Sequence, residues 1–170
     1  GMEVAAKSPP DGYTVVLTSP TMAISPSLYK KLNYDPQKDF APVSMVANIP
    51  NIMIVHLSVP ARTLKELIQL ARRNPGKLNF GTSGAGSTTH LSVEILKTLT
   101  KIDMVHVPYK GQGLALVGLI SGQVDMGIMA VPSALGMVQA NKVRPLAVLS
   151  ARRVPSLPNV PTSREAGVDD

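Results

Sequence analysis

The chain has 170 residues, enough for one or two domains, and 44% of them are hydrophobic, so a sizeable core can form. Charged residues make up 16%, which excludes a disordered, highly charged chain, and the absence of cysteine excludes disulfides, thiolate metal sites and a cysteine nucleophile. The net charge is +6, but the basic residues are scattered singly or in pairs without aromatic neighbours, which argues against a nucleic-acid surface and favours small anions.

The first third of the chain is predicted to contain few regular elements. Residues 13–19, Tyr-Thr-Val-Val-Leu-Thr-Ser, are typical of a buried strand that follows a Pro- and Gly-rich turn. A short helix is expected over Ser25–Leu32, with Ser25 as its cap and Pro26 at its first position. Residues 35–42 form a loop, and residues 43–57 are β-branched and extended, with a break at Pro50.

From residue 59 onward, strands and helices alternate. The clearest helix covers residues 63–74, where apolar residues recur at helical spacing and Thr63 forms a capping box with Glu66. A second helix, over 87–99, carries Leu91, Ile95 and Leu99 on one stripe. The other expected elements are strands over 78–81, 104–107, 124–129 and 144–150 and helices over 113–121 and 132–140, before an irregular, Pro-rich end. This alternation predicts an α/β fold with a parallel sheet, whose ligands bind at the carboxyl ends of strands.

The segment from Gly81 to His90 lies at such a strand end, between a strand and a helix. Its sequence is Gly-Thr-Ser-Gly-Ala-Gly-Ser-Thr-Thr-His. Glycines let the backbone approach a ligand, while the free N–H groups and the dipole of the helix start favour an anion. A plain turn capped by Ser87 or Thr88 is the simpler interpretation. A cap needs one hydroxyl side chain, however, and this segment has five.

The remaining strand ends offer weaker candidates. Tyr109 could present its hydroxyl to a ligand or be a partly buried residue beside a solvent-exposed Lys110, and both interpretations stay open. The stretch Met129–Ser133 offers backbone donors at a helix start, and Ser19, Pro20 and Thr21 follow the early strand. The histidines have no metal-ligand spacing, so no metal and no cofactor is predicted. His90 lies in a first helical turn, where positive charge is disfavoured, and is expected to be neutral.

A serine hydrolase is the rival interpretation from another class. Residues 81–85, Gly-Thr-Ser-Gly-Ala, nearly match a nucleophile elbow, in which Ser83 would attack and Asp125 would orient a histidine. Ala85 stands where that motif has glycine. Both His90 and His106 precede Asp125, whereas the hydrolase order places the histidine last.

Taken together, several segments resemble the Bug solute receptors of tripartite tricarboxylate transporters. They follow one another in unbroken order over nearly the whole chain: Pro10–Thr14, Asn33–Val43, Pro75–Leu78, Gly81–His90, Met104–Gly111, Gly122–Asp125, Pro132–Ala134 and Leu157–Thr162. The resemblance implies a two-lobed Venus-flytrap, the periplasmic binding protein type II fold. It also implies a periplasmic receptor without enzymatic activity, which delivers a small carboxylate, including a dicarboxylate or an amino acid, to membrane transporter subunits.

The same resemblance implies a division of the chain into lobes. Residues 3–42 would be part of the first lobe, 43–58 a hinge or crossover, 59–150 a Rossmann-like second lobe, and 151–170 a returning crossover. Family members have further first-lobe segments before and after this stretch. Residues 3–42 are therefore expected either to exchange between protomers in a domain-swapped dimer or to pack differently from the family.

The ligand contacts that the resemblance implies lie at three strand ends, and Tyr109 adds a contact at a fourth. The anion loop maps onto Ser83, Gly84, Ala85, Gly86, Ser87, Thr88, Thr89 and His90, and the cleft residues of the early strand onto Ser19, Pro20 and Thr21. The amides of Gly86–Thr89 would hold the carboxylate, assisted by the hydroxyls of Ser83, Ser87 and Thr88, and Tyr109 would close one wall. Ala130 replaces an Asp or Asn of many members, which favours a plain carboxylate over an amino acid. A periplasmic sensor or adaptor domain using the same cleft remains an alternative.

Overall fold

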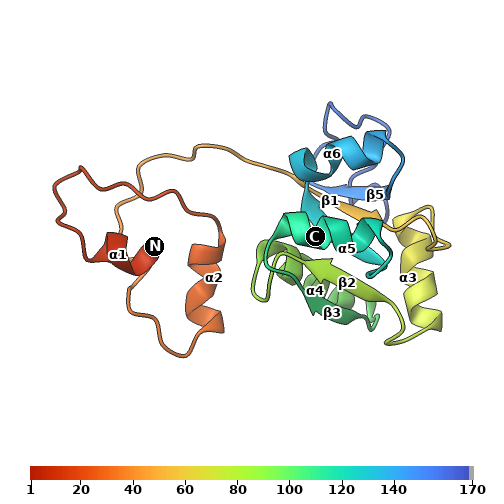
Figure 1. Ribbon diagram of the computed structural model, residues 1–170, viewed down its shortest axis with the longest axis horizontal. Coiled ribbons are helices and arrows are strands. Elements are labelled where there is room, and N and C mark those ends of the chain that lie inside the picture. The colour runs from red at the N-terminus through yellow and green to blue at the C-terminus, as the bar shows by residue number, and fades with distance from the viewer. Residues whose placement is uncertain (169–170) are drawn as a thin grey trace. The chain divides into compact units, whose positions relative to one another are not determined.

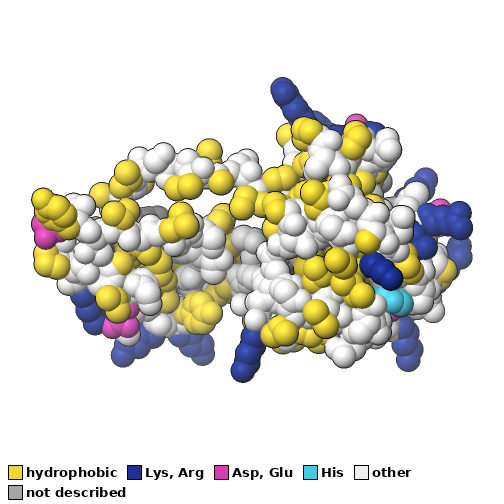
Figure 2. Space-filling model, turned by 45° about the horizontal axis from the view of Figure 1, so that its top comes forward, with side chains coloured by type: hydrophobic (Ala, Val, Ile, Leu, Met, Phe, Trp, Pro, Cys, Tyr) yellow, Lys and Arg dark blue, Asp and Glu magenta, His cyan; other side chains and the backbone are white. Residues whose placement is uncertain are grey.

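The computed structural model describes residues 1–168 and separates into two compact units, residues 1–48 and residues 49–170 (Figure 1). The first unit contains two short helices, α1 (Met2–Ala6) and α2 (Thr21–Leu28). Its remaining residues are irregular, and many apolar side chains lie on its surface (Figure 2). The predicted exchange of residues 3–42 between protomers stays a prediction.

Two expectations for this first unit are wrong. Residues 13–19 form no strand, and Tyr13 is 92% exposed, because no described strand pairs with this stretch. The short helix begins four residues earlier than expected, at Thr21, and contains Pro26 in its interior. Ser25 is not its cap: the Ser25 hydroxyl donates to the Thr21 carbonyl one turn earlier, at 2.7 Å.

The second unit is built on one five-stranded sheet with the order β3-β2-β4-β1-β5. Strand β2 pairs in parallel with β3 and β4, whereas β1 runs antiparallel to both β4 and β5. The sheet is therefore mixed, and the prediction of a parallel sheet holds only for the four strands after residue 59. The strand bounds are β1 (Asn51–Val55), β2 (Asn79–Thr82), β3 (Val105–Pro108), β4 (Met126–Ala130) and β5 (Arg144–Leu149).

Helices cover both faces of this sheet (Figure 1). One core cluster joins the sheet to α3 and α4, and a second joins it to α5 and α6. The chain therefore changes faces between β3 and α5, and the connections after β2 and β4 leave toward opposite faces. These helices are α3 (Leu64–Arg73), α4 (Thr88–Thr100), α5 (Gln112–Ile120) and α6 (Val131–Gln139).

Helix α3 confirms the predicted cap and buried stripe. The Glu66 N–H donates to the Thr63 hydroxyl at 3.2 Å, and the predicted core positions Leu64, Leu67, Ile68 and Ala71 are buried. The Glu66 carboxylate accepts from the N–H of Arg62, one residue before the expected partner, at 2.6 Å.

Helix α4 buries a different face from the one its apolar stripe suggests. Ile95 is 58% exposed and Leu99 is 53% exposed, while Val93 and Leu96 pack on the sheet. The buried face also includes Thr89 and Thr100, whose hydroxyls are hydrogen-bonded inside the protein. A hydroxyl that finds a partner can be buried at little cost, which a count of apolar residues does not reveal.

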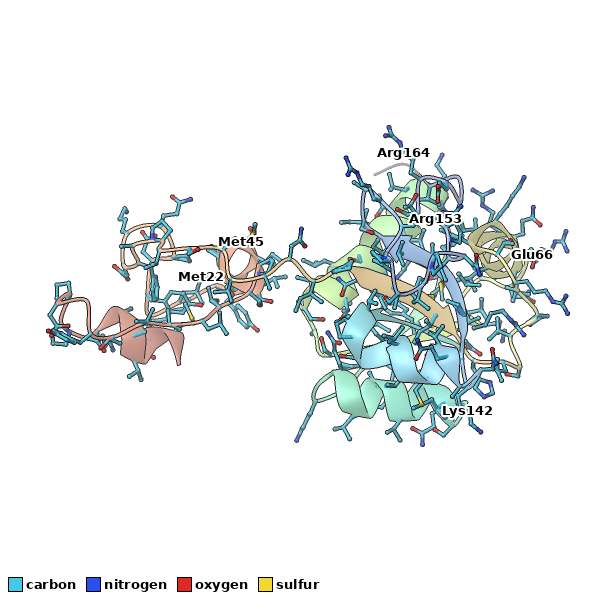
Figure 3. The ribbon with its side chains drawn as sticks, turned by 90° about the horizontal axis from the view of Figure 1, so that it is seen from above. Met22, Met45, Glu66, Lys142, Arg153 and Arg164 are labelled. Atoms are coloured by element: carbon cyan, nitrogen blue, oxygen red, sulfur yellow. The ribbon has the colours of Figure 1, made fainter. Side chains whose placement is uncertain are left out.

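The segment after β5 is irregular, as expected, but it is not loose. Val154, Leu157 and Val160 are buried in the cluster of α5 and α6. Arg153 donates to the Glu165 carboxylate at 2.8 Å and to the Pro158 carbonyl at 3.0 Å, which closes the segment on itself (Figure 3). None of the helices in the described residues is both long and apolar enough to span a membrane.

Candidate functional site

The loop between β2 and α4 lies at the point where the sheet's connections diverge. After β2 the chain turns toward the α3 and α4 face, and after β4, the neighbouring strand, it turns toward the α5 and α6 face. Such a point in an open α/β sheet leaves a crevice at the carboxyl ends of the strands, where ligands bind. Residues 83–87 form one side of this edge, and on the other side Ala130 ends β4 and Val131 begins α6.

Ser87 is the cap of α4, as the simpler interpretation of the loop requires. Its hydroxyl accepts from the His90 N–H at 3.2 Å and donates to the Gly84 carbonyl at 2.7 Å. Gly84 and Gly86 have φ angles of 135° and 74°, a region that side chains with a Cβ rarely adopt. The glycines therefore set the course of the loop, and the cap holds it against the first turn of the helix.

A cluster of hydroxyl groups around the buried Thr89 holds the loop between β2 and α4 in place. The Thr89 hydroxyl, which is fully buried, lies 3.0 Å from the Ser87 hydroxyl and 3.2 Å from the Ser83 hydroxyl. It also accepts from the Ser83 N–H at 3.4 Å. The hydroxyls of Ser83 and Ser87 thus already have partners within the loop, whereas that of Thr88 has none among residues 1–168.

The backbone N–H groups of the loop fall into two sets. Those of Ser83, Gly84, Gly86, Ser87 and His90 donate to acceptors within the protein. For Ala85, Thr88 and Thr89, no described residue provides an acceptor. Gly86 and Ser87 are therefore engaged and Thr89 is fully buried, so the amides that remain available for an anion are those of Ala85 and of Thr88, the first residue of helix α4.

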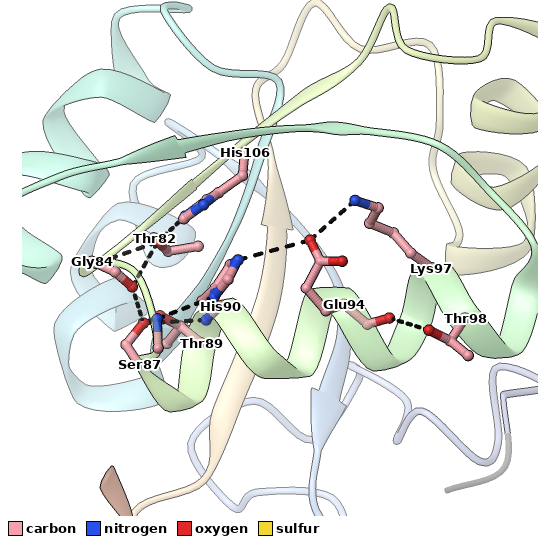
Figure 4. A network of polar contacts seen from close by, with 10 residues as sticks. Thr82, Gly84, Ser87, Thr89, His90, Glu94, Lys97, Thr98 and His106 are labelled. Carbon is pink, nitrogen blue, oxygen red and sulfur yellow. Dashed lines mark hydrogen bonds and ion pairs between the residues drawn. The ribbon is translucent and has the colours of Figure 1, made fainter. Parts of the chain in front are cut away.

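Two histidines support the loop from the side of β3 (Figure 4). The Gly86 N–H donates to Nδ1 of His90 at 3.2 Å, and Nε2 of His106 lies 2.6 Å from the Thr82 hydroxyl, which in turn contacts Gly84. The two imidazole rings are stacked with their centroids 4.0 Å apart. Burial lowers the pKa of His106 below its ordinary value of 6.5, and positive charge on His90 lowers it further.

Tyr109 packs inward from the end of β3. Its ring lies against Gly81 and Gly118, so closely that a Cβ at Gly118 would overlap it, and its hydroxyl donates to Gln123 at 3.4 Å. The side chain is half-buried and Lys110 is exposed, as the structural interpretation expected. Its role as a wall of the ligand site stays a prediction.

The end of β4 is held by a residue that the sequence did not single out. The Ala130 N–H donates to the Gln112 side-chain carbonyl at 3.1 Å, and the Val131 N–H donates to the Pro50 carbonyl at 2.9 Å. Gln112 is the first residue of α5, directly after Gly111. Gln112 thus begins the helix that follows the end of β3. This position at a strand end is the signal by which the sequence could have identified Gln112.

Ser19, Pro20 and Thr21 lie in the first unit, where they begin helix α2. The Ser19 hydroxyl donates to the Thr21 hydroxyl at 3.1 Å. Their predicted contact with a ligand stays a prediction.

The groups required by the serine hydrolase interpretation are engaged elsewhere. Ser83 contacts Thr89, and the histidines bond Gly86 and Thr82. Asp125 accepts from the Asn79 N–H at 2.8 Å, while the Asp125 N–H donates back to the Asn79 side chain at 2.9 Å. Among the described residues, no chain of hydrogen bonds joins Ser83, a histidine and Asp125.

Comparison with known proteins gives a match along the whole chain. The model of the tripartite tricarboxylate transporter family receptor matches residues 1–170. A UPF0065 protein in the tcbD-tcbE intergenic region of Pseudomonas sp. (strain P51) is 37% identical over 166 residues, which are 98% of this chain and 49% of that protein. The chain thus spans about half the length of the curated relatives it matches.

Solved structures show the same likeness. Rpa4515 of R. palustris with adipate is 40% identical with a TM-score of 0.91, over 98% of this chain and 56% of that one. The periplasmic binding protein BugD is 32% identical with a TM-score of 0.88, over 98% and 56%. MatC (Rpa3494) from Rhodopseudomonas palustris with bound malate is 31% identical with a TM-score of 0.84, over 98% and 57%.

Proposed function

The chain belongs to the tripartite tricarboxylate transporter receptor family, and from this membership we propose that it is the carboxylate-binding part of a periplasmic solute receptor. Such a receptor captures a small carboxylate and passes it to the membrane subunits of a transporter, without acting on it as an enzyme. Two similar structures that hold adipate and malate, and a third that is a periplasmic binding protein, support this proposal.

One observation indicates which atoms of the loop would bind the carboxylate. The N–H groups of Ala85 and Thr88 have no acceptor among the described residues, and they lie at the edge of the sheet where α4 begins. A carboxylate accepts hydrogen bonds from such groups, and the positive end of the helix dipole stabilises its charge. The exposed hydroxyl side of Thr88 can donate as well. No cationic side chain is needed for this kind of binding.

The other predicted contacts extend this proposed site. Gly84 and Gly86 let the backbone approach the ligand, while Ser83, Ser87 and His90 shape the loop. Ala130 offers no charged group to a ligand amine, which favours a plain mono- or dicarboxylate. Within the family's two-lobed plan, we assign residues 3–42 to the first lobe, 43–58 to the crossover, 59–150 to the second lobe and 151–170 to the returning segment, whose last two residues lie outside the described part.

A pair of substitutions at one residue tests the role of the amides. Thr88 is the first residue of α4, where its N–H has no helical partner, and Ser87 before it has the extended backbone, φ −68° and ψ 159°, that a following proline requires. Thr88→Pro therefore removes one ligand donor while keeping the helix start. Thr88→Ala removes only the hydroxyl and keeps the N–H.

Adipate and malate binding to the chain and both variants would be measured by calorimetry. A hydrogen bond to a charged group contributes about 1.5–3 kcal/mol, so Thr88→Pro should weaken binding at least about tenfold. Thr88→Ala should bind within a few-fold of the unsubstituted chain. Equal affinity of Thr88→Pro and the unsubstituted chain would exclude the amide of Thr88 as a ligand donor, and the absence of binding by any carboxylate would exclude the proposed function.

A further inference from the structure

His90 and His106 contact the anion loop through atoms whose hydrogen-bonding role changes with protonation. Nδ1 of His90 accepts from the Gly86 N–H at 3.2 Å, and only an unprotonated nitrogen can accept. The nitrogen on the other side of the ring, Nε2, faces the Glu94 carboxylate at 3.8 Å. The bond to Nδ1 fixes Gly86, the residue between the two available donors Ala85 and Thr88.

His106 joins the other end of the loop to the same pair of rings. Its Nε2 lies 2.6 Å from the Thr82 hydroxyl, which accepts from the Gly84 N–H at 3.3 Å. The ring lies between His90, at 4.0 Å, and the buried Phe80, at 5.0 Å between centroids. The Gly86 N–H thus bonds to His90 directly, and the Gly84 N–H is linked to His106 through the Thr82 hydroxyl.

The charges that face this stack come from helix α4 and strand β3. Glu94 and Lys97 lie on α4, 3.0 Å apart, and Lys97 also lies 5.7 Å from the Phe80 ring; on β3 the facing group is His106 itself. A proton on His90 would therefore lie beside the Glu94 carboxylate. That carboxylate is shared with Lys97, at 3.0 Å, and offsets part of the added charge, whereas the loss of the acceptor acts directly on the Gly86 N–H.

We propose that His90 and His106 are positioning residues for the anion loop, and that protonation of this pair releases the Gly86 N–H and weakens carboxylate binding in acid. The two rings are stacked with their centroids 4.0 Å apart, so a charge on one ring opposes a charge on the other. Near neutral pH the pair holds the loop with its donors in place. The effect on affinity rests on the proposed function, whereas the effect on Gly86 does not.

The direct test follows the Gly86 amide by ¹H–¹⁵N NMR while the pH is lowered from about 8 to about 5, the range in which histidines titrate. The Gly86 resonance should move in step with the ring resonances of His90, toward the position of an amide without a hydrogen bond. In parallel, adipate and malate affinities are measured at both ends of this range. They should fall by about two- to tenfold in acid, the effect of losing one hydrogen bond.

Two variants separate the acceptor from the ring. In His90→Asn, the side-chain oxygen can take the place of Nδ1 but does not titrate, so the Gly86 resonance should no longer follow the pH over this range, and the affinity should depend on pH only through His106. In His90→Phe, the stacked ring remains but the acceptor is lost. Its Gly86 resonance should lie near the acid position at every pH, with weak binding throughout.

The results that would overturn the inference differ from those that would exclude the proposed function. A Gly86 resonance that does not follow the histidines, or an affinity that rises in acid, overturns the inference. A Gly86 resonance that does follow them, in a chain that binds neither adipate nor malate at any pH, supports the positioning role and removes the proposed function.

Discussion

Oγ1 of Thr89 lies 3.0 Å from Oγ of Ser87, which places a fully buried hydroxyl directly beneath the cap of α4. The same hydroxyl lies 3.2 Å from Ser83, so one side chain joins the strand end to the helix start. The loop is thus held in place by its own polar groups.

Thr89→Val should therefore destabilise the protein. The substitution keeps the shape of the side chain but leaves the Ser83 N–H without its partner, at a cost of about 1–3 kcal/mol. Thr98→Val, on the exposed side of the same helix, is the matched control and should change the free energy of unfolding by no more than about 0.5 kcal/mol. Denaturant unfolding measures both. Equal stability of the two variants would contradict a role for the buried hydroxyl.

The lowered pKa of His106 predicts how stability depends on pH. In the unfolded chain this histidine takes up a proton near its ordinary value of 6.5, whereas in the folded protein burial resists protonation. The contribution of His106 to the free energy of unfolding is fully present above pH 6.5. It is lost as the pH falls through the lower pKa that His106 has in the folded protein. The unfolding free energy of the unsubstituted chain should therefore decrease, relative to that of His106→Phe, between about pH 7.5 and about pH 5. A difference that stays constant, or grows in acid, would contradict this expectation.

Tyr109 requires the absence of a side chain at Gly118. A methyl group there would overlap the Tyr109 ring, so Gly118→Ala should destabilise the protein by about 1–3 kcal/mol. Gly136 lies in α6 with nothing within 4 Å of its would-be Cβ, and Gly136→Ala should stabilise the helix by about 0.5–1 kcal/mol. Thermal unfolding distinguishes the two. Opposite signs are expected, and a stabilised Gly118→Ala would mean that Tyr109 does not occupy this space.

Gln112 offers a test of charge at the edge of the sheet. Gln112→Glu keeps an oxygen for the Ala130 N–H but adds a negative charge at the edge where the carboxylate is proposed to bind. Adipate and malate affinity should fall several-fold, and the fall should shrink at high salt. Gln123→Glu adds the same charge where the side chain accepts from Tyr109, and is expected to leave the affinity unchanged. Equal effects of both variants would indicate a general loss of positive field.

The succession of helices and strands in the second unit could be predicted because each element is indicated by residues close together in the sequence. The cap at Thr63, the stripe of α3 and the glycine turn before α4 each depend on residues within a few positions of one another. The direction of β1 could not be predicted in this way. Nothing in residues 51–55 indicates that they insert between β4 and β5, because strand direction depends on pairing partners distant in the sequence.

The sequence predicts an anion site in the loop, but it does not indicate which amides of the loop already have partners within the protein. The sequence pattern indicates the amides of residues 86–89, whereas the structure engages those of Gly86 and Ser87 internally. The partner of Gly86 is His90, four residues along the helix, and His90 stacks on a histidine of another strand. Such pairings depend on side-chain orientation and tertiary packing, which spacing along the chain does not specify.

The central claim is that the amides of Ala85 and Thr88 hold a carboxylate. Titration of the chain with adipate or malate, followed by ¹H–¹⁵N NMR, tests it most directly. The account predicts that these two amide resonances move downfield together and saturate at one ligand concentration. The amides of Leu64 and Lys65, at the capped start of α3, should stay in place. Shifts at α3 as large as those at α4, or no saturable shift at the two amides, would contradict the claim.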